Sequence, residues 1–277
     1  MDGFQQVADR PYRGRHITVG RVQDDPLISD PDKVFIAYSF EGRSPGSRAR
    51  EFPPMDEHGV IRTAPTSSKA YEQGNPALLL YPAVAQVGRT LLVSNGFQTN
   101  CMYTATMKHG FNSESNPADI LRESFRDPFY VHDPKFGWID MTSYEPDAPI
   151  NTARISAVVQ PYGFAMHIIK KGENGEPVSQ MWHFPFADLM PGDGKFISTY
   201  QGHMDDTPPF EGDPLDVRVG AHDAASISGE IWHQLAPKDG DKDVRGGLAV
   251  VCYNPGSMLL DVSITNRMDL EGKVASK

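Results

Sequence analysis

The chain has 277 residues, of which 26 are Lys or Arg and 36 are Asp or Glu, so its formal net charge is -10. This length can bury a sizeable core in one large domain or two small ones, and 22% charged residues excludes wholesale disorder. The net acidity excludes a general affinity for nucleic acid or an anionic membrane, because both need clustered positive charge. A small anionic ligand held by a local group of arginines remains possible.

The first 15 residues contain no apolar run of signal-peptide length, and no stretch approaches the roughly 18 consecutive apolar residues of a membrane span. We therefore expect a soluble, cytoplasmic protein. Cys101 and Cys252 are too few for a disulfide framework and suit a reducing compartment as small core residues. The nine histidines show no HxxH or HxxxH spacing and no CxxC pair occurs, so no metal is expected from local pattern.

Gly and Pro, with 25 and 23 residues, interrupt the chain at short intervals and favour many short strands over long helices. Segments rich in β-branched and aromatic residues are predicted as strands. They lie at 16–19, 34–40, 78–87, 90–94, 154–159, 164–169, 178–184, 196–200, 248–253 and 258–264. Ten strands are enough for two sheets.

Two helices are predicted. Asn116 before Pro117 reads as an N-cap followed by proline at the first helical position, and apolar residues then recur at helical spacing. The second helix is predicted over 222–235 from the same spacing. The order of strands and helices lacks regular βαβ alternation, which predicts an α+β fold of antiparallel sheets with outer helices. The polar stretches 50–76 and 237–245 are interpreted as excursions from a single domain.

The densest polar cluster is the loop 41–50 that follows the predicted strand 34–40. It embeds three arginines among Gly, Pro and Ser, so it can bend tightly. Arg43 and Arg48 could chelate a phosphate or carboxylate there, beside free backbone N–H groups. The alternative, which is the commoner situation, is a solvated basic loop.

A second polar cluster follows the predicted strand 90–94. Asn95 and Gly96 form a strong turn signal, and a turn by itself is the usual meaning of this pair. The functional interpretation is that Asn95 and Thr99 present an amide and a hydroxyl that read the edge of a base or an amide.

Two further residues could take part in proton transfer. Glu145 lies beside Pro146 in a loop that a helix cannot enter, as a general acid–base group requires, although an exposed turn glutamate is the alternative. Tyr81 interrupts an apolar run, and a buried tyrosine needs a hydrogen-bond partner, but core packing is the commoner explanation.

The familiar nucleophile and cofactor motifs are absent. No GxSxG, P-loop or dinucleotide-binding glycine pattern occurs, so no cofactor is expected. Cleavage between Asn100 and Cys101 could in principle expose a nucleophile, but a buried structural cysteine is the favoured interpretation.

Taken together and in order, these segments resemble the archaeal-type IMP cyclohydrolase family. The matching segments are residues 12–20 (YRGRHITVG), 35–39 and 43–48 (FIAYS, RSPGSR), 80–82 (LYP), 93–99 (VSNGFQT), 144–145 and 151–155 (YE, NTARI) and 196–200 (FISTY). The family's own motifs are YxGR leading to VG, AYRVSSRSxPNR, AYN, VSNGxxT, DYEKD…NTPRI and YISTY. The matches span about 190 residues. Ser39 and Ala153 replace the family's Arg and Pro. Residues 1–11 are an N-terminal extension relative to the family, and residues 50–76 and 100–140 are enlargements.

The resemblance implies a four-layer α-β-β-α sandwich like that of the N-terminal nucleophile hydrolases, without their self-cleavage. It implies ring closure of 5-formamidoimidazole-4-carboxamide ribonucleotide to IMP with loss of water. No metal or cofactor is needed. The partner would be a small phosphorylated purine precursor, with no nucleic acid or membrane involved, and the protein would be a homo-oligomer.

The resemblance also implies roles for residues in the matched motifs. The implied catalytic residues are Arg43, Tyr81 and Glu145. The implied substrate-binding residues are Arg48, Ser44, Asn95, Gly96, Thr99 and Arg154. In this scheme Glu145 is the general base and Tyr81 the donor at the departing formyl oxygen. How Arg43 and Arg48 divide the phosphate and oxyanion roles stays open.

Two alternatives remain, one of them another enzyme and the other a protein without catalytic activity. The first is an amidohydrolase of the N-terminal nucleophile type, which requires chain cleavage to expose its nucleophile. The second is a protein that binds purine ribonucleotides without catalysis.

Overall fold

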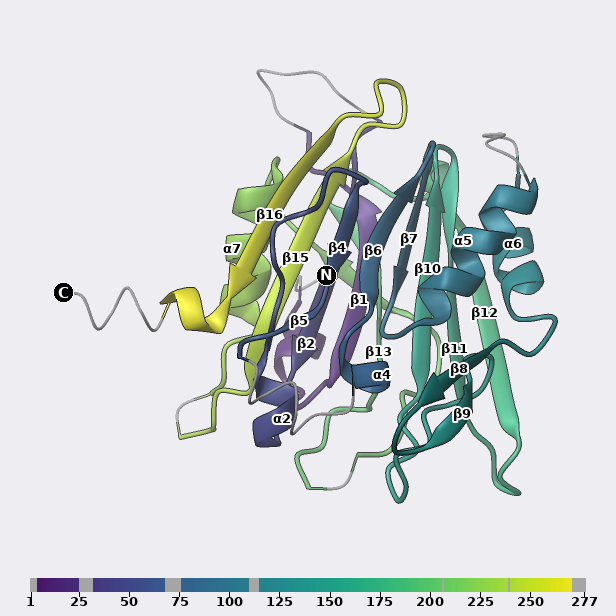
Figure 1. Ribbon diagram of the computed structural model, residues 1–277. Coiled ribbons are helices and arrows are strands. Elements are labelled where there is room, and N and C mark those ends of the chain that lie inside the picture. The colour runs from purple at the N-terminus through teal and green to yellow at the C-terminus, as the bar shows by residue number, and fades with distance from the viewer. Residues whose placement is uncertain are drawn as a thin grey trace.

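The computed structural model describes residues 4–24, 32–67, 76–109, 115–205, 207–238 and 240–270. Small parts of the predicted extension, enlargements and excursions lie outside these ranges, namely residues 1–3, 68–75, 110–114 and 239. The chain forms a mixed α+β structure of antiparallel sheets with few helices, as the sequence predicts (Figure 1).

Two six-stranded antiparallel sheets dominate the structure. The first has the order β14 (Leu215–Arg218), β13 (Asp193–Ser198), β1 (Arg15–Arg21), β2 (Val34–Glu41), β15 (Arg245–Tyr253) and β16 (Leu260–Asn266). The second has the order β12 (Pro177–Pro185), β11 (Gly163–Lys171), β10 (Arg154–Gln160), β7 (Thr90–Ser94), β6 (Pro82–Val87) and β4 (Val60–Arg62). Two small ribbons pair β3 (Arg50–Glu51) with β5 (Ala64–Pro65) and β8 (Tyr130–Asp133) with β9 (Gly137–Asp140).

The helices within the described ranges are short, and none of them is long and apolar enough to cross a membrane. They are α1 (Gln5–Ala8), α2 (Pro45–Arg48), α4 (Pro76–Leu79), α5 (Gln98–His109), α6 (Pro117–Ser124) and α7 (Ala224–Gln234), with one 3-10 turn at Phe186–Asp188 and a helical turn at residues 267–270. The predicted start of α6 is confirmed, because the Asn116 side chain accepts from the Ala118 N–H at 2.9 Å with Pro117 in the first turn.

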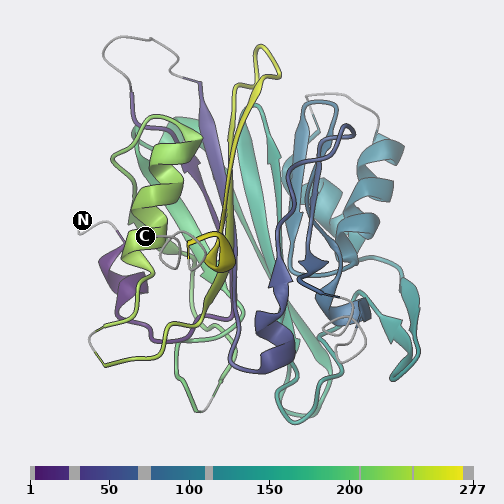
Figure 2. The same cartoon turned by 60° about the vertical axis from the view of Figure 1, so that its left-hand side comes forward.

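Alternation along the strands separates three apolar layers. The inward residues of both sheets, such as Ile36 and Ala157, form the central core between them. The outward residues of β2 pack under α1 and α7, where Ile227 is buried, and the outward residues of β7 and β10 pack under α5 and α6, where Leu121 is buried. The described residues therefore stack as helices, sheet, sheet, helices (Figure 2).

All ten predicted strands have counterparts, but some boundaries were wrong. Leu78 and Leu79, predicted as strand, belong to α4, which Pro76 begins in a position that suits the first helical turn. Residues 199–200 lie beyond the end of β13, and residues 258–259 lie in the turn before β16.

Helix α5 was not predicted. Its buried face combines the apolar Met102 and Ala105 with the polar Gln98, Thr99 and Thr106, so it carries no clear apolar stripe. The sheet beneath it supplies the stabilising contacts, because the helix packs on β6 and β7.

His167 on β11 provides a test of the layer beneath α6. Its ring lies 4.5 Å from the Phe125 ring and its Nε2 is 2.5 Å from the Ser179 hydroxyl, and burial lowers the pKa of His167 to about 3. The unfolded chain binds a proton near pH 6.5 that the folded chain does not, so stability is lost as the pH falls from about 6.5 towards 3. The free energy of unfolding of the wild type is expected to fall between pH 7 and pH 5, and in His167→Gln this fall is expected to be smaller by about 2 kcal/mol.

Urea unfolding at the two pH values measures this difference. His58→Gln is the matched control, because the His58 side chain is 78% exposed. This substitution is expected to leave the pH dependence of stability unchanged. The same pH dependence in wild type and His167→Gln would contradict the assignment.

Candidate functional site

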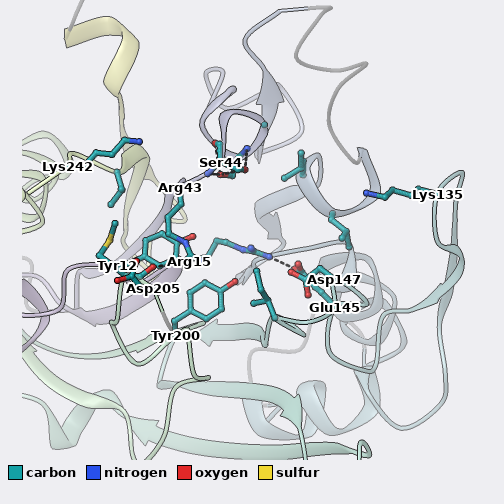
Figure 3. A pocket seen from close by; sticks show the side chains of 17 residues that line it. Tyr12, Arg15, Arg43, Ser44, Lys135, Glu145, Asp147, Tyr200, Asp205 and Lys242 are labelled. Carbon is teal, nitrogen blue, oxygen red and sulfur yellow. Dashed lines mark hydrogen bonds and ion pairs between the residues drawn. The ribbon is translucent and has the colours of Figure 1, made fainter.

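A cavity of about 770 Å³ opens at the end of the sandwich where β1 begins and β2 ends. This volume falls in the usual range for small-molecule sites, about 300–1,000 Å³. Its lining comes from segments far apart in sequence: Tyr12, Arg15, Arg43, Ser44, Gly46, Ser47, Leu78, Leu79, Lys135, Glu145, Asp147, Ile150, Tyr200, Met204, Asp205, Lys242 and Val244 (Figure 3). The structure thus brings three predicted site residues, Arg43, Ser44 and Glu145, to one cavity.

Glu145 lies at the base of this cavity between two buried arginines. Its carboxylate forms an ion pair with Arg15, the first residue of β1, and lies 3.9 Å from Nη1 of Arg154, the first residue of β10. The Glu145 side chain is 2% exposed, so the alternative interpretation of Glu145 as an exposed residue in a turn is wrong. Its loop is held in place because the Glu145 N–H donates to the Thr152 carbonyl at 2.9 Å.

The pKa values of this cluster follow from burial and opposite charge. Burial raises the pKa of the Glu145 carboxyl, against the opposing effect of Arg15 and Arg154. Burial works in the other direction on Arg15, yet the Glu145 carboxylate keeps the Arg15 pKa well above its ordinary value. Burial lowers the pKa of Arg154. The result is a carboxylate that is desolvated yet held by two cations.

Two guanidinium groups in this cluster keep polar atoms without partners in the part of the chain that the structure describes. Nε of Arg15 and Nη2 of Arg154 are buried and make no hydrogen bond there. Buried donors are satisfied in the great majority of protein sites. Arg15 lines the cavity, so its unused Nε is a donor that a bound polar ligand would satisfy, whereas Arg154 lies outside the cavity lining.

Tyr81 lies behind this cluster in the central core. Its hydroxyl is 2.7 Å from the hydroxyl of Tyr38 on β2, and its N–H donates to the Thr63 hydroxyl at 3.0 Å. Both tyrosines contribute to the raised pKa of Arg15, after the larger effects of burial, which opposes the rise, and of Glu145. Tyr81 does not itself line the cavity. Tyr81 therefore packs in the core, and its hydroxyl has the hydrogen-bond partner that a buried tyrosine needs.

Arg43 forms the rim of the cavity on the side of the first sheet. Its guanidinium carbon lies 4.7 Å from the centre of the Tyr12 ring, and its Nη1 donates to the Met204 carbonyl. Tyr12 in turn stacks on Tyr200 with ring centres 5.4 Å apart. The two rings hold the arginine side chain against one wall.

The rest of the arginine loop differs from the prediction. The N–H groups of Ser44, Ser47, Arg48 and Ala49 bond inside the loop, because Ser44 and Ser47 form a reciprocal capping box around α2. The Gly42 N–H donates to the Val244 carbonyl at 2.8 Å. These five N–H groups are thus not free for an anion, so the prediction of free backbone N–H groups does not hold for them.

Arg48 is not among the residues that line the cavity. Its side chain lies close to Gly42, where an added Cβ would approach Cγ of Arg48 within 2.8 Å. Arg48 therefore packs against the start of its own loop, outside the cavity that Arg43 lines.

Asn95, Gly96 and Thr99 lie outside the cavity lining. The Asn95 side chain accepts from the Ile155 N–H at 2.8 Å and donates to the Ala153 carbonyl at 3.0 Å, while the Thr99 hydroxyl donates to the Pro82 carbonyl at 2.6 Å. These bonds tie the end of β7 to β10 and β6. In this arrangement the three residues brace the strand ends that carry Arg154 rather than contact the cavity.

Sequence reasoning missed several cavity residues, above all Arg15, Tyr12, Tyr200 and Lys242. Arg15, Tyr12 and Tyr200 all lie inside segments quoted for the family resemblance, which was the available signal. No pattern distinguished Lys242, because it lies in a charged turn. Among the described residues, no three His, Cys, Asp or Glu side chains lie close enough to hold a metal ion.

Comparison of the chain with protein-family models and with curated protein sequences finds no match. The likeness to the cyclohydrolase family thus rests on the short ordered motifs.

Proposed function

We propose that the chain is an IMP cyclohydrolase that closes 5-formamidoimidazole-4-carboxamide ribonucleotide to IMP, on a fold like that of the N-terminal nucleophile hydrolases. The observation that carries this proposal is the buried Glu145 carboxylate held between Arg15 and Arg154 at the base of a ligand-sized cavity. The ordered motifs and the layered arrangement of helices and sheets support the same assignment.

The reaction needs three things from the protein. A carboxamide nitrogen is a poor nucleophile, so closure requires proximity to the formyl carbon, removal of an N–H proton, and stabilisation of the oxyanion that forms. Glu145 is suited to the proton removal, because burial raises the pKa of its carboxyl towards the working pH. Water is the leaving product, and no redox step occurs.

The oxyanion is assigned to the arginine donors that have no partner among the described residues. Nε of Arg15 is buried beside Glu145, so it can donate to an oxygen that gains charge as the ring closes. Tyr81 and Tyr38 share a hydroxyl hydrogen bond, but neither residue lines the cavity, so the cavity lining does not support the predicted role of Tyr81 as donor at the departing oxygen. Arg154 then positions the carboxylate.

Replacement of the two loop arginines separates their roles. We expect Arg43→Ala to raise KM about 10- to 100-fold, because a charge-assisted bond to the substrate phosphate is worth about 1.5–3 kcal/mol. Arg48→Ala is expected to change KM by less than about threefold, since Arg48 packs on Gly42 away from the cavity. Steady-state kinetics measures both. A fall in kcat at constant KM in Arg43→Ala would assign Arg43 to the oxyanion instead.

An ultraviolet assay of the purified protein tests the proposal directly. The formamido ribonucleotide is expected to convert to IMP much faster than in its slow uncatalysed closure. If the protein binds IMP but the rate equals that of the uncatalysed reaction, the enzyme proposal is rejected and the alternative of a non-catalytic purine ribonucleotide-binding protein is favoured.

The amidohydrolase alternative has weaker support. Cys101 lies inside α5, and burial raises the pKa of its thiol to about 12, which disfavours the reactive thiolate. Intact-mass analysis discriminates the two readings. Our proposal expects an uncleaved chain, whereas cleavage before an internal Ser, Thr or Cys would favour the alternative.

A further inference from the structure

We infer that Lys242, in the turn before β15, is the companion of Arg43 in a phosphate-binding subsite at one end of the cavity. This inference rests on the proposed function for the identity of the whole ligand. The phosphate subsite itself is argued from the cavity and its charges. It replaces Arg48 with a residue about 200 positions away in the chain.

The backbone brings the turn of Lys242 to the arginine loop. The Gly42 N–H donates to the Val244 carbonyl at 2.8 Å. Arg43 is next to Gly42 and Lys242 is two residues before Val244, so this hydrogen bond joins the two segments that carry them. Val244 is also buried with Tyr12 and Tyr200, the rings that support Arg43. In Figure 3 Lys242 and Arg43 lie on the same side of the cavity, whereas Lys135 lies on the opposite side.

The charges at this end suit a phosphate monoester. Lys242 lines the cavity with an exposed side chain and has no carboxylate partner within the described ranges. Arg43 likewise bonds a carbonyl rather than a carboxylate. Asp205 is the carboxylate that lines the same end (Figure 3). A planar guanidinium and a flexible ammonium together match the geometry of a phosphate.

The chain supplies a matched control four residues earlier. Lys238 belongs to the same turn but forms an ion pair with Asp9 at 3.0 Å, outside the cavity. Lys238→Ala therefore removes the same charge from the same turn without removing a cavity residue. Because both lysines are exposed, neither variant is expected to impair folding, and melting curves check this.

Isothermal titration with IMP, inosine and ribose 5-phosphate at low salt tests the inference. Lys242→Ala is expected to weaken the binding of IMP and of ribose 5-phosphate about tenfold or more and to leave the binding of inosine unchanged. The difference from wild type is expected to shrink as the salt concentration rises. Lys238→Ala is expected to bind all three like wild type. Equal phosphate affinity in Lys242→Ala and wild type overturns the inference.

The same titration separates this inference from the proposed function. If wild type binds ribose 5-phosphate in a manner that depends on Lys242 but does not bind IMP, the phosphate subsite stands and the cyclohydrolase proposal fails. If IMP binds and is formed but Lys242→Ala has no effect, the cyclohydrolase stands and the subsite fails. Binding of neither phosphorylated compound rejects the subsite.

Discussion

Replacing Glu145 with glutamine is expected to lower kcat for ring closure by about 10²- to 10⁴-fold, the usual contribution of a positioned general base. Glutamine keeps the size of the side chain and can still accept from Arg15, but it cannot take a proton from the carboxamide. KM is expected to change little, because the proposed phosphate subsite lies at the other end of the cavity. Steady-state kinetics with the formamido ribonucleotide measures both constants.

The pH profile gives an independent readout of the same residue. A base must be ionised, and burial raises the pKa of Glu145, so activity is lost as the pH falls through a value above the usual one of about 4.3. The acid limb of the wild-type profile is therefore expected to lie at higher pH than for an exposed glutamate. It is expected to disappear from the residual activity of Glu145→Gln.

Two controls make this result specific. Asp205→Asn removes one negative charge from the same cavity, at the end away from Glu145, and is expected to leave kcat within about twofold. Melting curves show whether Glu145→Gln stays folded, since Arg15 and Arg154 lose their carboxylate partner. Unchanged turnover in Glu145→Gln would remove the base assignment. Equal losses in both variants would indicate an effect of overall charge.

The largest effect on stability is expected at Glu41, at the end of β2. Its carboxylate accepts from the Arg13 N–H at 2.6 Å and from Nε of Arg13 at 2.7 Å. The remaining Arg13 donors reach the carbonyls of Val7 in α1 and of Leu235 after α7. Arg13 and Glu41 are 3% and 1% exposed, so the pair joins two outer helices to the first sheet without solvent.

Glu41→Ala is expected to lower the free energy of unfolding by about 3–5 kcal/mol, because it leaves Arg13 charged and buried without a counter-ion. Urea unfolding monitored by circular dichroism measures this loss. Asp216→Asn breaks the exposed cross-strand pair with Lys195 and is expected to cost less than about 1 kcal/mol. A similar small loss in Glu41→Ala would show that water replaces the carboxylate.

Gly14 explains why neighbouring arginines serve such different purposes. Residues 13 and 15 would share a face in a regular strand, but Gly14 has φ of +76°, which interrupts the alternation. Arg13 therefore points to the outer helices and Glu41, while Arg15 points to Glu145. A side chain at position 14 would also collide with Tyr200.

Local pattern accounts for most of the secondary structure. The ten strands and the helices α6 and α7 were predicted from apolar periodicity, caps and turn residues, which depend only on neighbours in sequence. Helix α5 was missed because its buried polar residues become satisfied only against β6 and β7. A local pattern carries no information about such a partner.

The sequence by itself determined the α+β class, ten of the strand segments, and the loops from which Arg43 and Glu145 come. Only the tertiary structure decided which polar groups meet. Arg15 pairs with Glu145 across 130 residues because β1 and β10 face each other in the two sheets. Lys242 lines the same cavity as Arg43, and Arg48 does not, because a backbone hydrogen bond from Gly42 to Val244 brings a distant turn to the cavity. The packing of the two sheets and the register of their strands determine which residues meet, and both are set only when the whole chain has folded.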